Sequence, residues 1–173
     1  MKKGFTLLEL IITVVVLSVL LTIAAPSFSH LVERFAIHQA KNEISQIYNM
    51  ARSEATFRNR PMYVHFKNVT TAFSNNTDWC IAVTESATFS NCSNEVVYIL
   101  KGDLLRDIYI KRHAAYSYVE FDRVRGWPDL GAGAINLISF YKNENKPLNL
   151  EAHFVGRNSV CSDGGEWYGI GQC

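Results

Sequence analysis

The sequence has almost no excess of charge of either sign: 17 lysines and arginines stand against 16 aspartates and glutamates, a formal net charge of +1. Proteins that bind nucleic acid or anionic lipid across their whole surface are strongly basic, so the composition gives no global signal for such a partner. The 173 residues suffice for one ordinary domain with an appendage.

The sequence also lacks the common motifs of catalysis and cofactor binding. It has no glycine-rich phosphate loop and no G-x-S-x-G, and residues 162–165 form a turn motif, not a nucleophile elbow. The cysteines lack the C-x2-C spacing of a zinc site. The histidines have no metal-ligand spacing either: His30, His38, His65, His113 and His153. We therefore expect no catalytic residue, no metal and no cofactor.

The four cysteines form two pairs with the same spacing, C-x11-C. Short closed loops of this kind are typical of disulfides formed in an oxidising compartment. Four cysteines can pair in three ways. We expect the local pairing, Cys80 with Cys92 and Cys161 with Cys173, and expect the second bond to hold the C-terminal segment.

One long apolar run lies at the N-terminus. Residues 5–25 are apolar or weakly polar except for Glu9, and as a helix they span roughly 32 Å, about the thickness of a bilayer's hydrocarbon core. Proline directly after Ala-Ala would hinder signal-peptidase cleavage there. Lys2 and Lys3 precede the run, so the positive-inside rule places the N-terminus in the cytoplasm and the chain from Pro26 outside.

Glu9 is the anomaly in this run. A charge at the centre of a membrane helix costs on the order of 3 kcal/mol, and less near its end. Acids inside a membrane usually have a functional partner, but a carboxylate this close to the helix end can also reach the interface unaided. Taken alone, Glu9 is equally consistent with a functional partner in the membrane and with a carboxylate that simply reaches the interface.

The surroundings of Glu9 decide between them. The stretch GFTLLE at residues 4–9, after two lysines and before the apolar run, resembles the class III signal of type IV pilins and type II secretion pseudopilins. The resemblance implies cleavage between Gly4 and Phe5 by prepilin peptidase, N-methylation of Phe5, and pairing of Glu9 with the N-terminal amine of a neighbouring subunit. Pro26 also matches, since family helices commonly carry a proline there. In lipid, such an amine and carboxylate satisfy each other only when subunits dock.

The same resemblance implies partners and a location. The partners are other pilins or pseudopilins, prepilin peptidase and the inner-membrane assembly platform. The location is a single pass through a bacterial inner membrane, with the C-terminal domain in the periplasm, and later a pilus or pseudopilus.

Helical periodicity continues beyond the apolar run. We expect one helix from about residue 5 to 58, bent at Pro26 because proline cannot bond the Thr22 carbonyl, and ended by Pro61. Its second half has an apolar stripe, which we expect to pack on the chain's own C-terminal domain. The stripe consists of Phe28, Leu31, Val32, Phe35, Ala40, Ile44, Ile47, Tyr48, Ala51 and Ala55.

After residue 61 the apolar pattern changes to the period of a strand. We expect strands at residues 62–66, 79–84, 96–100, 108–110, 118–121, 135–141, 150–155 and 159–161. No helical run between them is long enough for a crossover, so the pairing should be antiparallel. The expected fold is α+β: a long N-terminal helix packed on a small antiparallel β-sandwich. The expected divisions are a leader at 1–4, a transmembrane helix at 5–25, its amphipathic continuation at 26–60 and a β domain at 61–173.

The second half of the chain resembles one branch of the pilins. A strand, a glycine turn, a G-x-I-x-L strand and a late Gly-Arg pair follow in order at residues 119–121, 125–126, 133–137 and 156–157. This order is similar to the GspH/FimT group of minor pilins, and the terminal cysteine pair is similar to the FimU/FimT proteins. The resemblance implies a structural, assembly-priming subunit of a type IV pilus. The H-type pseudopilin of a type II secretion system has the same fold and is the alternative.

DNA binding is a further alternative, because the FimT branch binds DNA through a G-R-x-R motif. Here residues 156–159 read G-R-N-S, without the second arginine. The candidate contacts are Arg123, Arg125 and Arg157, and a basic group with aromatic rings nearby offers charge for phosphates. Acidic residues interrupt that group, so we favour a solvated sheet edge and loop. The group consists of Arg106, Lys111, Arg112, Arg123 and Arg125.

Overall fold

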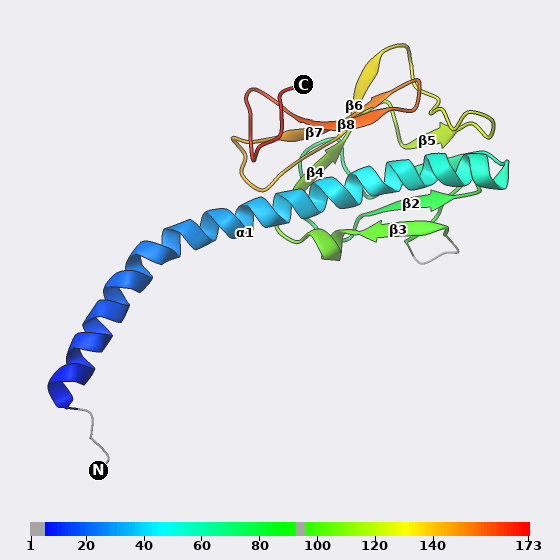
Figure 1. The fold of residues 1–173 in the computed structure, drawn as a ribbon. Helices are drawn as coiled ribbons and strands as arrows, with labels where there is room; N and C mark the ends of the chain where they lie inside the picture. Colours follow the sequence, from blue (N-terminus) through cyan, green and yellow to red (C-terminus); the bar gives the residue numbers. More distant parts are fainter. Residues whose placement is uncertain (1–5, 93–95) are drawn as a thin grey trace. The chain divides into compact units, whose positions relative to one another are not determined.

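The computed structural model describes residues 6–92 and 96–173. Within them the chain forms a long N-terminal helix, α1 (Leu7–Arg58), followed by eight strands and a short 3-10 helix (Figure 1). By its internal contacts the chain divides into two compact units, residues 1–35 and 36–173. Each unit is described by itself below.

The end of α1 is fixed by local backbone geometry. Asn59 has a left-handed φ of 51°, its N–H donates to the Thr56 carbonyl, and the N–H of Arg60 donates to the Ala55 carbonyl. These two bonds form a Schellman motif, which satisfies carbonyls that a helix end otherwise leaves unpaired. Pro61 follows at once, so the helix ends where the sequence predicted.

The apolar stripe of α1 is only partly buried within the chain. From Ala40 onward its members are at most 2% exposed and form one core with both sheets. The prediction that the whole stripe packs on the C-terminal domain is wrong for the four earlier members, because the unit that contains that domain begins only at residue 36. These side chains are 44–67% exposed: Phe28, Leu31, Val32 and Phe35.

The β part consists of two four-stranded sheets. The first has the order β3-β2-β1-β5, and the second has the order β4-β6-β7-β8. In the first sheet the strands are β1 (Met62–Lys67), β2 (Cys80–Thr84), β3 (Tyr98–Lys101) and β5 (Tyr118–Phe121). In the second they are β4 (Tyr109–Arg112), β6 (Ala134–Tyr141), β7 (Leu148–His153) and β8 (Asn158–Ser162).

Every pairing between these strands is antiparallel, as the sequence predicted. The expected fold class, a long helix packed on antiparallel sheets, is confirmed. One strand is displaced: β7 was expected at 150–155 but ends at His153, because a tight turn follows in which Gly156 has a φ of 79°. The 3-10 helix η1 (Gly102–Leu105) was not predicted.

The core lies where α1 meets both sheets. Tyr48 of α1 is 2% exposed, and its ring meets the edge of Phe121 of β5 at a centroid distance of 4.8 Å. The hydroxyl of Tyr48 has no hydrogen-bond partner among the described residues. Burial raises the pKa of this phenol, so it stays neutral.

Candidate subunit-assembly site

The first part of α1 exposes a continuous apolar surface. Every described side chain from Thr6 to Ile23 is exposed, with large apolar residues ranging from 52% at Val16 to 77% at Leu7. Soluble monomers rarely expose apolar patches of this extent. An apolar surface of this extent is expected to contact lipid or other helices.

Glu9 is the only charged residue between Leu7 and Ile23. It lies in the first turn of α1, where its N–H donates to the Thr6 hydroxyl oxygen at 3.3 Å. Thr6 thus acts as the helix N-cap, and the pattern Thr-x-x-Glu is that of a capping box. Sequence reasoning missed this cap. The Glu9 carboxylate has no hydrogen-bond or ion-pair partner in the part of the chain that the structure describes.

The hydroxyl groups of the same segment differ from Glu9 in this respect. Thr13, Ser18 and Thr22 each donate a 2.8 Å hydrogen bond to a carbonyl one turn earlier in the helix. Such bonds satisfy a polar side chain without help from outside. Glu9 is the one acidic residue of this segment. Unlike the three hydroxyl groups, its carboxylate has no hydrogen-bond partner among the described residues.

No single helix among the described residues passes a combined test of length and hydropathy for a membrane span. The segments Leu7–Ile23 and Phe28–Arg58 pass that test only as a pair. Pro26 lies between them, and the kink expected there stays a prediction. Gly4 and Phe5, the expected cleavage and methylation positions, lie outside the described residues.

The arginines named as candidate DNA contacts lie on two neighbouring turns. Arg123 and Arg125 belong to the turn after β5, and Arg157 belongs to the turn between β7 and β8. All three are exposed. The guanidinium carbon of Arg125 lies 4.8 Å from the ring centroid of Trp127.

Arg52 of α1 joins these two turns, and sequence reasoning missed it. Its Nη1 donates to the Gly156 carbonyl at 3.0 Å. A Cβ on Gly126 would lie 2.8 Å from Cγ of Arg52, and a Cβ on Gly156 would lie 3.1 Å from the Gly126 carbonyl oxygen. Both glycines have positive φ, at 62° and 79°. The glycines of the two motifs recognised in the sequence therefore mark the places where the two turns close around Arg52.

Two further members of the basic group, Lys111 and Arg112, make their contacts elsewhere in the chain. Lys111 of β4 lies over the ring of Phe73, 4.4 Å from its centroid. Arg112 holds a loop together, since its Nε donates to the Val69 carbonyl at 2.9 Å and its Nη1 to the Tyr116 carbonyl at 3.1 Å. Arg112 thus has a structural role.

Both expected disulfides are confirmed: Cys80–Cys92 and Cys161–Cys173. The first closes a loop that returns to His65 of β1. Nε2 of His65 donates to the Ser86 carbonyl at 2.9 Å, and the Phe89 ring stacks on it at 5.3 Å. Burial lowers the pKa of His65. No group of three potential ligands within the described residues is placed to hold a metal.

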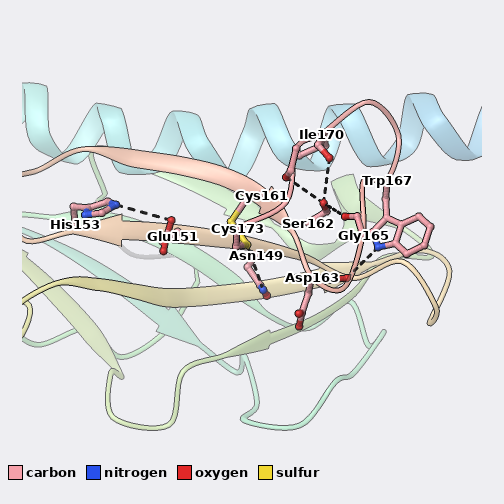
Figure 2. The surroundings of a disulfide bond; sticks show 11 residues. Asn149, Glu151, His153, Cys161, Ser162, Asp163, Gly165, Trp167, Ile170 and Cys173 are labelled. Atoms are coloured by element: carbon pink, nitrogen blue, oxygen red, sulfur yellow. Dashed lines mark hydrogen bonds and ion pairs between the residues drawn. A yellow bond between two sulfur atoms is a disulfide. The ribbon is translucent and has the colours of Figure 1, made fainter.

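The second disulfide fastens the last segment of the chain to β8 (Figure 2). The N–H of Ser162 donates to the Gly171 carbonyl at 2.9 Å, and the N–H of Cys173 donates to the Ser162 carbonyl at 3.1 Å. The Ser162 hydroxyl is buried and lies 3.1 Å from the Ile170 carbonyl oxygen. Figure 2 shows Ser162 next to Cys161 of the disulfide, with its hydroxyl directed toward Ile170 and Gly165 of the last segment. The segment is thus held by covalent and backbone bonds together.

Comparison with known structures gives the fold a precedent. Two crystal structures of the type IV minor pilin FimU from Pseudomonas aeruginosa PAO1 superpose on the chain with TM-scores of 0.54 and 0.55, at 14% and 16% identity. The alignments cover 71% and 75% of this chain and 90% and 91% of FimU. At such low identity the likeness concerns the fold alone. No curated protein matches the sequence at a significant level.

Comparison with models of protein families identifies the family of the sequence, beyond the likeness in fold. The prokaryotic N-terminal methylation motif matches residues 1–25, and the family of the type II transport protein GspH matches residues 40–151. This fold and family are those of structural pilin-like subunits, not of known enzymes. Because the second match spans well over half of the sequence, the chain belongs to the GspH family of pilin-like proteins.

Proposed function

We propose that the protein is a minor pilin, a structural and assembly-priming subunit of a type IV pilus. The observation that carries this proposal is Glu9, the one charge in the exposed apolar segment Leu7–Ile23, whose carboxylate has no partner among the described residues. A group of this kind is completed by a second molecule. A filament of staggered, parallel helices supplies that molecule.

The assembly step follows from electrostatics in a medium of low dielectric constant. Prepilin peptidase cuts between Gly4 and Phe5, and the methylated amine of Phe5 becomes a cation at the helix start. In lipid, this cation and the Glu9 carboxylate of the next subunit each lack a partner until the helices dock. The exposed apolar side chains of Leu7–Ile23 then pack on neighbouring helices.

The proposed location is a bacterial inner membrane, with the globular unit in the periplasm. Lys2 and Lys3 before the apolar run support this orientation. The two disulfides support an oxidising compartment for residues 80–173. Other pilins, prepilin peptidase and the assembly platform of the inner membrane are the proposed partners.

The pilus and the type II secretion pseudopilus can be separated in one strain. The gene is deleted in the native host, and pili per cell and secretion of a type II substrate are both measured. Loss of pili with normal secretion supports the minor pilin. Loss of secretion with normal pili shows an H-type pseudopilin instead.

The role of Glu9 is tested by complementing that strain with Glu9→Gln. We expect normal membrane insertion, because removing a charge favours the helix in lipid, but a large loss of filaments. Glu33→Gln, which changes an acid of α1 outside the apolar run, is the matched control and should restore assembly. Normal filament number with Glu9→Gln would refute the pairing.

DNA binding remains the second candidate, because Arg52 holds the turns of Arg123, Arg125 and Arg157 together. Gel retardation at low salt compares the wild type with the Arg123→Ala/Arg125→Ala double variant. Lys101→Ala, an exposed charge on β3, serves as control. Retardation lost only in the double variant supports DNA binding, and no retardation of the wild type removes it.

A further inference from the structure

A hollow of about 420 Å³ lies beside the end of β5. Its apolar lining includes Trp127 and Leu130 from the turn after β5 and Phe154 from the turn after β7. The rings of Trp127 and Phe154 meet edge to face, with centroids 6.5 Å apart. Two segments far apart in the sequence thus form one lined surface.

The turn that carries Trp127 is rigid without any ligand. The Asp122 carboxylate accepts hydrogen bonds from the N–H groups of Val124 and Arg125 at 2.8 Å and of Trp127 at 2.9 Å. These bonds, that of Arg125 foremost, lower the pKa of Asp122. Asp129 N–H also donates to the Glu120 carbonyl at 2.7 Å. The hollow is therefore formed in advance, which reduces the entropic cost of binding.

Two further carboxylates line the hollow, those of Glu120 and Asp129. Neither forms an ion pair with a residue in the described part of the chain. Glu120 lies directly opposite Tyr63 of β1 in the antiparallel register, so its backbone position on β5 is set by the sheet. The residues that line the hollow include no lysine, arginine or histidine. Arg125 already lies over the Trp127 ring, 4.8 Å from its centroid, and its charge also acts on Asp122. The Glu120 and Asp129 carboxylates, which have no ion-pair partner among the described residues, remain as the two negative charges that flank the aromatic surface.

We propose that this hollow docks a lysine or arginine side chain of a partner protein. The aliphatic stem of such a side chain covers apolar surface while its charged end meets carboxylates, and aromatic rings attract the cation. Charge complementarity selects this occupant over an acidic or neutral one. Buried arginine beside aromatic rings is also a common anchor of protein interfaces.

The proposal goes beyond the pilin assembly role. It concerns the globular unit of residues 36–173 and makes no use of Glu9, Gly4 or Phe5. The result of the Glu9→Gln assembly experiment therefore does not bear on the proposed docking hollow. Conversely, a variant of the hollow that loses binding still contains the complete helix.

The test uses the full-length protein in detergent micelles with 15N-labelled tryptophan. Only three indole signals are expected, and Trp127→Phe identifies that of Trp127. The probes are a short fluorescent peptide with one central arginine and the same peptide with citrulline, which keeps the shape and removes the charge. We expect the arginine peptide to shift the Trp127 signal, with little change at the other two tryptophans and little effect from the citrulline peptide.

Matched variants then test the carboxylates by fluorescence anisotropy. Glu120→Gln/Asp129→Asn should weaken binding of the arginine peptide by on the order of tenfold, whereas Glu166→Gln, an exposed carboxylate elsewhere, should not. Unchanged unfolding midpoints establish that both proteins fold. A Trp127 signal that stays in place, equal binding of the two peptides, or equal loss in Glu166→Gln would each overturn the proposal.

Discussion

Replacing Gly126 by alanine perturbs the junction where the turn after β5 closes on α1. The added Cβ would lie 2.8 Å from Cγ of Arg52, 2.9 Å from the Arg52 carbonyl oxygen and 3.2 Å from a methyl carbon of Thr56. The side-chain atom of Arg52 can move, but its carbonyl belongs to a helix and cannot. The turn itself must therefore shift, and with it the hydrogen bond that joins Arg52 to Gly156.

The expected loss of stability has two parts. Alanine in the left-handed region, where Gly126 has a φ of 62°, costs roughly 1–2 kcal/mol. Overpacking of a close contact costs about 1–3 kcal/mol more. The free energy of unfolding should thus fall by about 2–5 kcal/mol, a large fraction of the stability of an ordinary domain.

Two other glycines separate these parts. Gly164 has a φ of 78°, but a Cβ added there would meet nothing within 4 Å, so Gly164→Ala measures the backbone cost alone. Gly131 has neither a positive φ nor a neighbour within 4 Å of an added Cβ. Gly131→Ala should therefore be neutral or slightly stabilising, since alanine restricts the unfolded chain.

The assay is urea unfolding in mild detergent, followed by tryptophan fluorescence, with midpoints converted to free energies through the common slope. The expected order of stability is Gly131→Ala, then Gly164→Ala, then Gly126→Ala. Equal midpoints for Gly126→Ala and Gly164→Ala would show that the contact with Arg52 is unimportant. Equal midpoints for all three would refute the strain argument as well.

Further predictions concern the core, a buried histidine, processing and the last disulfide. Tyr48→Phe should leave stability unchanged or raise it by up to about 1 kcal/mol in the same urea assay, because it removes a buried hydroxyl without a described partner. Burial lowers the pKa of His65 in the folded protein. The stabilising contribution of the neutral His65 side chain should therefore be complete above the unfolded pKa near 6.5 and be lost as the pH falls through the pKa of the folded state. His65→Gln should flatten that part of a curve of unfolding free energy against pH. Gly4→Ala should leave an unprocessed precursor on immunoblots, and a product of normal size would contradict the proposed cleavage. Replacing Cys161 and Cys173 by serine should cost on the order of 3 kcal/mol, measured as a shifted urea midpoint, and an unshifted midpoint would show that backbone bonds suffice.

The fold was predictable because local patterns in the sequence agree with one another. Helical periodicity and Pro61 located the end of α1, and alternating apolar residues bounded by turn residues located all eight strands. Alternation does not show where pairing stops, however. Phe154 and Val155 continue the pattern of β7, but they are 44% and 38% exposed, since a turn follows His153.

Burial of the helix stripe was only partly predictable for a similar reason. Period and composition identify an apolar face, and they do so equally well for Phe35 and for Ile44. They carry no information about what covers that face. Ile44 is 1% exposed because both sheets lie against it, whereas Phe35 is 67% exposed.

The two sites differ in what sequence reasoning could find. Glu9 could be proposed from the sequence because a charge in an apolar run is a local anomaly. Arg52 was missed because an arginine on a helix with polar neighbours is typical of a solvated face. Its partners Gly126 and Gly156 are close only in the folded chain, the second 104 residues away. In the sequence only Gly126 and Gly156 pointed to this junction, as parts of the resemblance to the GspH/FimT group.

The cap at Thr6 changes how the cost of Glu9 should be counted. A helix leaves its first N–H groups unpaired and carries a partial positive charge at that end, which favours a carboxylate in the first turn. Glu9 lies in that turn, and its own N–H is already satisfied by Thr6. Under the proposed role, a membrane-embedded monomer would therefore bear less than the full cost of a charge in lipid before assembly. In the proposed pairing, the ammonium of a neighbouring subunit would still supply a whole opposite charge, so docking would remain favourable. Thr6→Ala should therefore lower the amount of membrane-stored monomer on immunoblots more than the number of filaments per stored monomer, and the opposite ratio would contradict this role of the cap.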